Sequence, residues 1–396
     1  MKWTNPGHEL DKIGHLLKEK ENVYIYGAGK WGEHICNTII HLLTWLKWQI
    51  TFIDFDEKKQ LSGIMGLSVL SPEVLDTLDK TKSFVVVCAD EENLPIMMKN
   101  AENAGFVQMQ NLFDYWSLLS ADLSVHFFYN LDTVYIYSVN MTPSTVCNLN
   151  CKGCSALIPY MKKHITYDLD TLCENVDIFF EKVDLVWHFY VGGGEILLYP
   201  KLVELIEYIG EKYGNKIISY ELVMNGTIIP DDNLCSVFNK YKMRIYLSDY
   251  TKNVPLAKKN IEKVFTKLRQ FKDIDVVRKC AERWWDFSPD LYNENKYSEE
   301  ELIKHYTSCN NWCLTLVNKT ISSCTLADFA VKAGVVEYRK EDYLDLSKIN
   351  FHNRSELVEF SCRFINRGYL EFCKRCVGLR NNHNYIESAV QILHNK

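Results

Sequence analysis

The chain has 396 residues, 47% of them hydrophobic, and carries a net charge of −6 at pH 7. This size and apolar content predict two or three globular domains. An acidic chain lacks the basic footprint of nucleic-acid binding, so we expect no nucleic-acid partner. Residues 1–21 hold no signal-peptide-like apolar run, and polar residues interrupt the most apolar stretch, so we expect a cytoplasmic protein without a membrane span. In that reducing compartment the 14 cysteines point to metal ligands rather than disulfides.

A strand, a glycine turn, a helix and a second strand open the chain. Residues 22–26 and 48–55 are β-runs, and residues 33–46 have helical periodicity. The turn after the first strand matches G-x-G-x-x-G, and an acidic residue stands near the end of the second strand. Glycines there let backbone N–H groups approach a pyrophosphate, and the carboxylate can reach a ribose hydroxyl. The residues of this dinucleotide-binding fingerprint are Gly27, Gly29, Gly32 and Asp54.

The first domain as a whole contains only about the first half of a dinucleotide-binding fold. Ser71 and Pro72 open a helix as N-cap and first-turn residue, and strands follow at residues 84–89 and 106–110. The pattern changes near residue 125. This part resembles the small Rossmann domains of sugar-nucleotide and capsule-modifying proteins. Two interpretations stay open, namely a site for a nucleotide or nucleotide sugar and a scaffold domain without a ligand.

Strands and helices alternate again from residue 133 onwards, which predicts an α/β domain with a parallel sheet or barrel. The expected strands are 133–138, 185–191, 217–224, 243–247 and 273–277, and the helices are 169–183, 200–213 and 231–241. Glycine and polar residues stand at the strand ends, where α/β barrels keep their sites. They are Gly192, Gly193, Gly194, Glu195, Asn225, Ser248 and Asp249.

Three cysteines in the spacing C-x3-C-x2-C follow the first of these strands. They are Cys147, Cys151 and Cys154. Thiolates this close in a loop can converge on one soft metal centre, and three ligands leave one iron of a four-iron cluster open for chemistry. The alternatives are a zinc loop, although zinc usually recruits four ligands, or three unrelated cysteines.

This cysteine spacing, with the strand-end motifs behind it, resembles the radical S-adenosylmethionine (radical SAM) family. The resemblance implies a partial (β/α)6 barrel, a 4Fe–4S cluster on the three cysteines and S-adenosylmethionine on the open iron. It also implies reduction by a flavodoxin- or ferredoxin-type donor and a 5′-deoxyadenosyl radical that abstracts hydrogen from a substrate. Gly193, Gly194 and Glu195 are similar to the GGE motif that contacts the methionyl amino group. Asn225 begins an N-G-T similar to the one after the family's third strand, and Ser248 and Asp249 are similar to residues at the end of the fourth strand, near the ribose and carboxylate. Gly153 departs from the family, because an aromatic residue commonly stands there.

The C-terminal third carries a second group of cysteines. Cys313 and Cys324 bracket a hairpin-like stretch with Asn318-Lys319 as its turn, and Cys373 and Cys376 form a C-x2-C pair. This order resembles the twitch or SPASM-type extensions of radical SAM enzymes and implies one auxiliary 4Fe–4S cluster on these four residues. Cys309 is the alternative for one of the four, and zinc is the rival metal. Five unpaired cysteines are expected to be small buried hydrophobes, namely Cys36, Cys88, Cys173, Cys235 and Cys362.

The expected domains are a Rossmann-like domain at 1–125, a linker with the first barrel strand at 126–140, a radical SAM barrel at 141–295 and an auxiliary-cluster domain at 296–396. We expect hydrogen abstraction from a sugar, a glycan precursor or a nucleotide-linked small molecule. One alternative is epimerisation or cross-linking of a ribosomally made peptide. Two others are an NAD-dependent oxidoreductase with structural zinc and a nucleotide-binding regulatory or scaffold protein.

Overall fold

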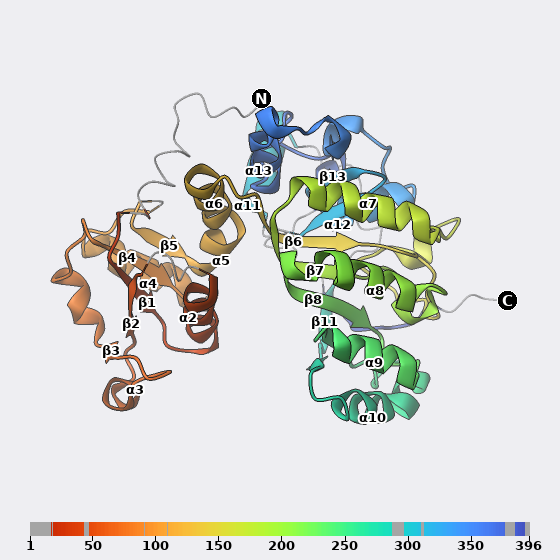
Figure 1. The fold of residues 1–396 in the computed structure, drawn as a ribbon, viewed down its shortest axis with the longest axis horizontal. Coiled ribbons are helices and arrows are strands. Elements are labelled where there is room, and N and C mark those ends of the chain that lie inside the picture. Colours follow the sequence, from red (N-terminus) through yellow and green to blue (C-terminus); the bar gives the residue numbers. More distant parts are fainter. Residues whose placement is uncertain are drawn as a thin grey trace. The chain divides into compact units, whose positions relative to one another are not determined.

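The structure, a computed structural model, describes residues 17, 19–42, 47–90, 92–108, 110–286, 297–309, 313–376 and 385–392. It divides into two compact units between Thr133 and Val134, shown in Figure 1. The last helix of the first unit, α6 (Leu123–Leu131), extends past residue 125, where the sequence places the domain end. None of the described helices combines the length and the apolar composition that a membrane crossing needs.

The N-terminal unit is built on a five-stranded parallel sheet in the order β3-β2-β1-β4-β5. This order, with strands on both sides of β1, is the doubly wound arrangement. All five residues of β4 are buried, as expected for a parallel strand covered on both faces. The strands are β1 (Asn22–Tyr26), β2 (Gln49–Ile53), β3 (Val69–Leu70), β4 (Ser83–Val87) and β5 (Leu112–Asp114). The other helices are α2 (Lys30–Leu42), α3 (Glu57–Ser62), α4 (Leu94–Asn103) and α5 (Tyr115–Ser117).

One local expectation in this unit is wrong, and a second holds only in part. The strand expected at residues 106–110 lies at β5 instead, because the Asn111 side chain accepts a bond from the Val107 N–H and closes a turn there. The helix expected after Ser71 does begin there, with Ser71 at the N-cap and Pro72 in the first turn, but it is a 3-10 helix, Pro72–Asp76, and the Ser71 side chain makes no capping bond. Both differences are local turn chemistry, and the order of the elements is unaffected.

The C-terminal unit is built on an eight-stranded sheet in the order β10-β9-β8-β7-β6-β12-β13-β14. Strands β6 to β10 are parallel and adjacent in chain order, joined by helices α7 to α10, while β12 extends the parallel part on the other side of β6. The parallel strands are β6 (Tyr135–Met141), β7 (Leu185–Val191), β8 (Ile217–Met224), β9 (Arg244–Ser248), β10 (Asp275–Lys279) and β12 (Leu314–Val317). The connecting helices are α7 (Leu169–Lys182), α8 (Leu202–Tyr213), α9 (Asp232–Lys240) and α10 (Pro255–Arg269).

The two faces of this sheet differ in chemistry. Phe189 of β7 stacks on Phe180 of α7, with ring centroids 5.6 Å apart, so this face is apolar and covered by helices such as α7 and α8 in Figure 1. Side chains alternate across a strand, so the neighbouring residues His188 and Tyr190 lie on the opposite face. The register places them beside Ser219 and Glu221 of β8. We call this second face the inner face.

The remaining elements follow the parallel strands in the chain. The expected hairpin is present as β12 and β13 (Thr320–Ser322), and its turn residues Asn318 and Lys319 have φ of 47° and 60°, as a two-residue hairpin turn requires. The other strands are β14 (Tyr343–Asp345), β11 (Arg283–Trp285) and β15 (Tyr385–Glu387), the last two paired with each other. The last helices are α11 (Glu299–Ser308), α12 (Thr325–Lys332), α13 (Ser355–Ser361) and the 3-10 helix Glu371–Lys374.

Candidate active site and metal centres

The three cysteines that the sequence groups lie on the loop after β6, and their thiolate charges act on one another. Burial raises the pKa of Cys147 to about 11 and that of Cys151 to about 12, and the charges of the neighbouring thiolates add to both shifts. Burial also raises the pKa of Cys154. Among the described residues, no three His, Cys, Asp or Glu side chains converge as ligands of a single metal ion. A donor set of three cysteines on one loop, one buried and two half-buried, fits an iron–sulfur cluster, whose positive iron ions hold cysteines as thiolates.

The glycines after β7 let two backbone segments cross. Gly193 has φ of 155°, and a Cβ there would lie 2.4 Å from the Ser144 carbonyl oxygen. A Cβ on Gly194 would lie 2.0 Å from the carbonyl oxygen of Val146, the residue before Cys147. The Gly194 and Glu195 N–H groups donate to these two carbonyls at 3.0 and 2.9 Å. The glycines therefore serve the cysteine loop itself, in addition to any ligand that approaches them.

Glu195 ties the end of β7 to the end of β8. Its carboxylate is 2% exposed and accepts bonds from the N–H of Asn225 at 2.8 Å and of Leu197 at 3.1 Å. Burial raises its pKa to about 7, although the two backbone bonds oppose the shift. The Asn225 amide in turn donates to the side chain of Asn148, which lies beside Cys147. Glu195 and Asn225, both predicted from the sequence, thus hold the end of β8 against the cysteine loop.

Ser248 ends β9, and Asp249 follows it. Asp249 accepts two bonds from the Arg278 guanidinium, at 2.9 and 2.7 Å. Burial alone would raise its pKa, but these bonds and those from Thr251 lower it to about 2. The next residue, Tyr250, was missed by the sequence reasoning. It packs beside Cys151 and Cys154, whose thiolate charges add to the effect of burial in raising its pKa.

The inner face carries a second group of residues that the sequence reasoning missed. His188 Nδ1 lies 2.6 Å from Glu221 Oε1, and Glu221 is fully buried. Burial raises the pKa of Glu221, but the bonds from His188 and Ser219 outweigh it and leave a net lowering. In the neutral tautomer that carries its hydrogen on Nδ1, His188 donates a hydrogen bond to the Glu221 carboxylate, and Nε2 is then an acceptor.

Four more side chains, from β9 and β10, extend this inner face. Arg244 pairs with Asp275 at 2.6 Å, and its guanidinium lies 3.9 Å from Glu221. The Lys279 ammonium lies over the Tyr246 ring, 4.0 Å from its centroid. The sequence signal for this surface was polar residues at every second position of adjacent strands.

The second cysteine group differs from the expected one by one member. Four cysteines line a cavity of ≈ 20 Å³, namely Cys309, Cys324, Cys373 and Cys376. Cys313 is not among its lining residues. Cys313 immediately precedes β12, hydrogen-bonds Ser138 of β6, and its charge acts on Tyr190 of the inner face. The structure therefore places the alternative member Cys309, and not Cys313, with the other three cysteines around this small cavity.

A buried cation faces these four cysteines. Arg363 is 8% exposed, lines the same cavity, and donates to the Tyr306 carbonyl oxygen at 2.9 Å. Burial lowers its pKa, but the charges of Tyr306 and of three cysteines, including Cys309 and Cys324, outweigh burial and raise it. A guanidinium here offsets negative charge on bound thiolates.

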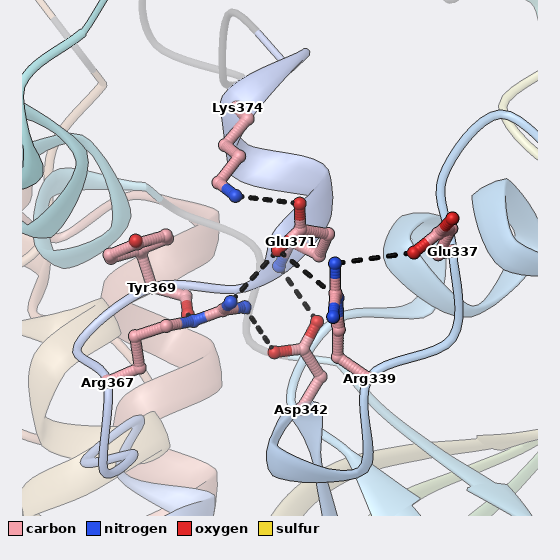
Figure 2. A network of polar contacts seen from close by, with 7 residues as sticks. All are labelled: Glu337, Arg339, Asp342, Arg367, Tyr369, Glu371 and Lys374. Atoms are coloured by element: carbon pink, nitrogen blue, oxygen red, sulfur yellow. Dashed lines mark hydrogen bonds and ion pairs between the residues drawn. The ribbon is translucent and has the colours of Figure 1, made fainter.

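An ion-pair network fixes the short helix that carries Cys373 (Figure 2). Arg367 bridges Asp342 at 2.7 Å and Glu371 at 2.9 Å, and the Glu371 N–H donates to Asp342 at 2.8 Å. Lys374 adds a bond to Glu371 at 2.8 Å. Asp342 is 5% exposed, so it depends on these partners for its hydrogen bonds.

The glycine turn of the N-terminal unit is bonded to its own acidic residue. Asp54 accepts from the Ala28 N–H at 2.8 Å and pairs with Lys59 at 3.0 Å. A Cβ on Gly27 would lie 2.1 Å from the Cys88 carbonyl oxygen, and one on Gly32 would lie 2.0 Å from that of Gly27. Gly29 has nothing within 4 Å of the same position. Two of the three glycines thus serve packing, and the third borders open space.

Comparison with known families identifies the central segment. Residues 141–248 match the model of the Radical SAM superfamily. No curated protein matches the sequence. These residues form a radical SAM domain. A domain of this superfamily carries enzymatic chemistry with a 4Fe–4S cluster and S-adenosylmethionine, as the cysteine spacing predicts.

Solved structures give weaker likenesses, with TM-scores below 0.5. BtrN in complex with AdoMet and 2-DOIA is 11% identical, with 62% of this chain and 94% of that chain covered and a TM-score of 0.38. The AdoMet-bound anSMEcpe is 16% identical, with 64% and 92% covered and a TM-score of 0.36. RSP, a Rex-family repressor, is 16% identical, with 25% and 54% covered and a TM-score of 0.21. The match spans about half the length of that repressor.

Proposed function

We propose that Cys147, Cys151 and Cys154 hold the catalytic cluster and that the substrate is a small polar molecule, namely a sugar, a glycan precursor or a nucleotide-linked compound, bound on the inner face. When bound and reduced by a flavodoxin- or ferredoxin-type donor, cluster and S-adenosylmethionine supply a 5′-deoxyadenosyl radical for hydrogen abstraction. The main observation in support is the direct backbone contact between the glycine turn and the cysteine loop. It is closest at Gly194 and Val146.

The residues around the loop hold it and the cofactor in place. Gly193 and Gly194 leave room for close backbone approach at the methionine end, and Glu195 fixes the Asn225 backbone at the end of β8. Ser248 and Asp249 stand at the end of the next strand, where the resemblance places the ribose and carboxylate. Arg278 sets the orientation of the Asp249 carboxylate.

The inner face supports a polar substrate. His188, with Nδ1 against the Glu221 carboxylate, presents Nε2 as an acceptor for a substrate hydroxyl proton. Arg244 and Lys279 add two donors on neighbouring strands. Groups of this kind orient a ligand by hydrogen bonds, which suits a hydroxyl-rich molecule better than an apolar one.

We further propose an auxiliary 4Fe–4S cluster on Cys309, Cys324, Cys373 and Cys376, and a nucleotide or nucleotide-sugar ligand at the N-terminal glycine turn. The shared cavity of the four cysteines supports the first. The open surroundings of Gly29 support the second, with Asp54 near the ribose. Calorimetry with a nucleotide sugar tests the second proposal, and an unchanged affinity in Asp54→Ala would contradict the assigned contact.

The main test is anaerobic reconstitution followed by dithionite and S-adenosylmethionine. We expect release of 5′-deoxyadenosine by the wild type. The matched variant His188→Ala should keep this basal release and lose its stimulation by nucleotide sugars or sugars. If only peptides stimulate the release, the small-molecule assignment is wrong while the radical chemistry stands.

A further inference from the structure

The segment after β15 pairs with the cysteine loop. The Lys152 N–H donates to the Val390 carbonyl oxygen at 2.7 Å, and the Ile392 N–H donates to the Asn150 carbonyl oxygen at 2.7 Å. Cys151 and Gln391 form the antiparallel bridge between these two bonds. Backbone pairing on both sides of Cys151 fixes this residue against a segment 240 positions away in the chain.

The Gln391 side chain reaches the sulfur of Cys151. Its Nε2 lies 3.1 Å from Cys151 Sγ and 2.7 Å from the Ala389 carbonyl oxygen, while its Oε1 accepts from the Asn150 N–H at 2.8 Å. A flipped amide would set two donors against each other at Asn150 and two acceptors at Ala389. The surrounding backbone groups therefore determine which end of the amide faces the sulfur.

The contact is enclosed by the same segment. Cys151 and Ala389 are buried in one apolar cluster with residues of α10 and with the Trp284 ring of β11 packed against it. A Cβ on Gly153 would lie 3.0 Å from Ile386 of β15, which together with its φ of 69° explains why glycine stands where the family commonly has an aromatic residue. In such surroundings a hydrogen bond is electrostatically stronger than in water.

We propose that Gln391 is a positioning and tuning residue of the catalytic cluster, through an N–H···S bond to Cys151, an inference that rests on the proposed function. Reduction adds negative charge to the cluster and its sulfurs. A donor aimed at a ligating sulfur stabilises the reduced state more than the oxidised state and raises the reduction potential, since hydrogen bonds to sulfur are among the factors that set it. The segment 388–392 is thus part of the cluster's environment, although it lies far from it in sequence.

The test measures the midpoint potential of the reconstituted cluster without S-adenosylmethionine, by a titration followed by electron paramagnetic resonance. Gln391→Met removes the donor at similar length and should shift the potential to a more negative value with the iron content unchanged. Gln391→Glu keeps the acceptor for Asn150 and adds negative charge, so its shift should be larger. The matched control is Lys252→Gln, which removes an ion pair to Glu387 of β15 and leaves the sulfur contact intact.

The outcomes separate this inference from the function on which it depends. A wild-type potential in Gln391→Met overturns the inference and leaves the proposed cluster standing. Loss of the cluster in both Gln391 variants, with the fold intact by circular dichroism, also overturns it, because the amide would then only close the loop. Absence of the cluster from the wild type, or its persistence without Cys147, Cys151 and Cys154, overturns the proposed function itself.

Discussion

The two cysteine groups of the C-terminal unit are assembled in opposite ways. Cys147, Cys151 and Cys154 lie within one loop, and backbone bonds to the glycine turn hold that loop. The other four, Cys309, Cys324, Cys373 and Cys376, come from the end of α11, the start of α12 and a short helix near the C-terminus. The first group is close together in the sequence, whereas the second group comes together only when the helices pack.

The charges beside the two groups also differ. The Glu195 carboxylate acts on Cys147 and raises its pKa further beyond the effect of burial. The Arg363 guanidinium acts in the opposite direction on Cys324 and Cys373. A nearby cation stabilises an added electron and a nearby anion opposes it. Of two clusters bound at these places, the one beside Arg363 should have the higher reduction potential.

The largest expected effect separates the groups by function. Replacing Cys147, Cys151 and Cys154 together with alanine should abolish 5′-deoxyadenosine release, because four cysteines at the second group would leave none of its irons open for S-adenosylmethionine. Iron analysis should still find about four irons per chain at the second group. Normal release from this variant would show that the loop is not the catalytic site.

Gly194→Val tests the backbone crossing that holds the first group. The new side chain would meet the Val146 carbonyl oxygen, which belongs to the loop itself and has no free rotamer. We expect loss of most S-adenosylmethionine cleavage and of the loop's four irons, read from visible absorption and iron content. Gly29→Ala is the control, since its Cβ meets nothing within 4 Å. A Gly194 variant with full iron would mean that the loop tolerates displacement.

A pair of single substitutions tests the membership of the second group. Cys309→Ala should remove about four irons per chain, while Cys313→Ala should leave the iron count unchanged, because Cys313 lies with Ser138 on the inner face. The reverse result would restore the grouping that the sequence suggests. Stoichiometric zinc in place of iron would identify this site as a structural zinc site.

The smallest expected effect concerns the ion pairs of Figure 2. These ion pairs hold the helix of the second cysteine group, whereas backbone hydrogen bonds hold the loop of the first. Arg367→Ala leaves Asp342 buried without its cation and should destabilise this region by about 2 kcal/mol. Arg339→Ala, whose side chain is 48% exposed, should cost about 0.5 kcal/mol. Each substitution is made in the variant that lacks the loop cysteines, and the measurement is the urea concentration at which half of its iron is released. If this midpoint is the same with and without each substitution, the network contributes nothing to the stability of this site.

Spacing alone predicted the loop cysteines, the strand-end motifs and the hairpin with its Asn318-Lys319 turn, because each depends on residues close in sequence. It could not choose between Cys309 and Cys313. That choice follows from the pairing of β12 with β6, which directs Cys313 towards Ser138, and from the packing of α11 on the helix of Cys373. The contact of His188 with Glu221 was missed for the same reason, since the register between β7 and β8 is a tertiary property.

The pairing of the cysteine loop with residues 390–392 also has a consequence for protein synthesis. Asn150 and Gln391 are separated by 241 positions. At a translation rate of about 5–20 residues per second, the ribosome makes the loop roughly 12–50 seconds before the segment that covers it. During that interval the nascent chain exposes Cys151 without the Gln391 amide. Iron–sulfur carriers therefore have tens of seconds of access to the loop before the fold closes over it.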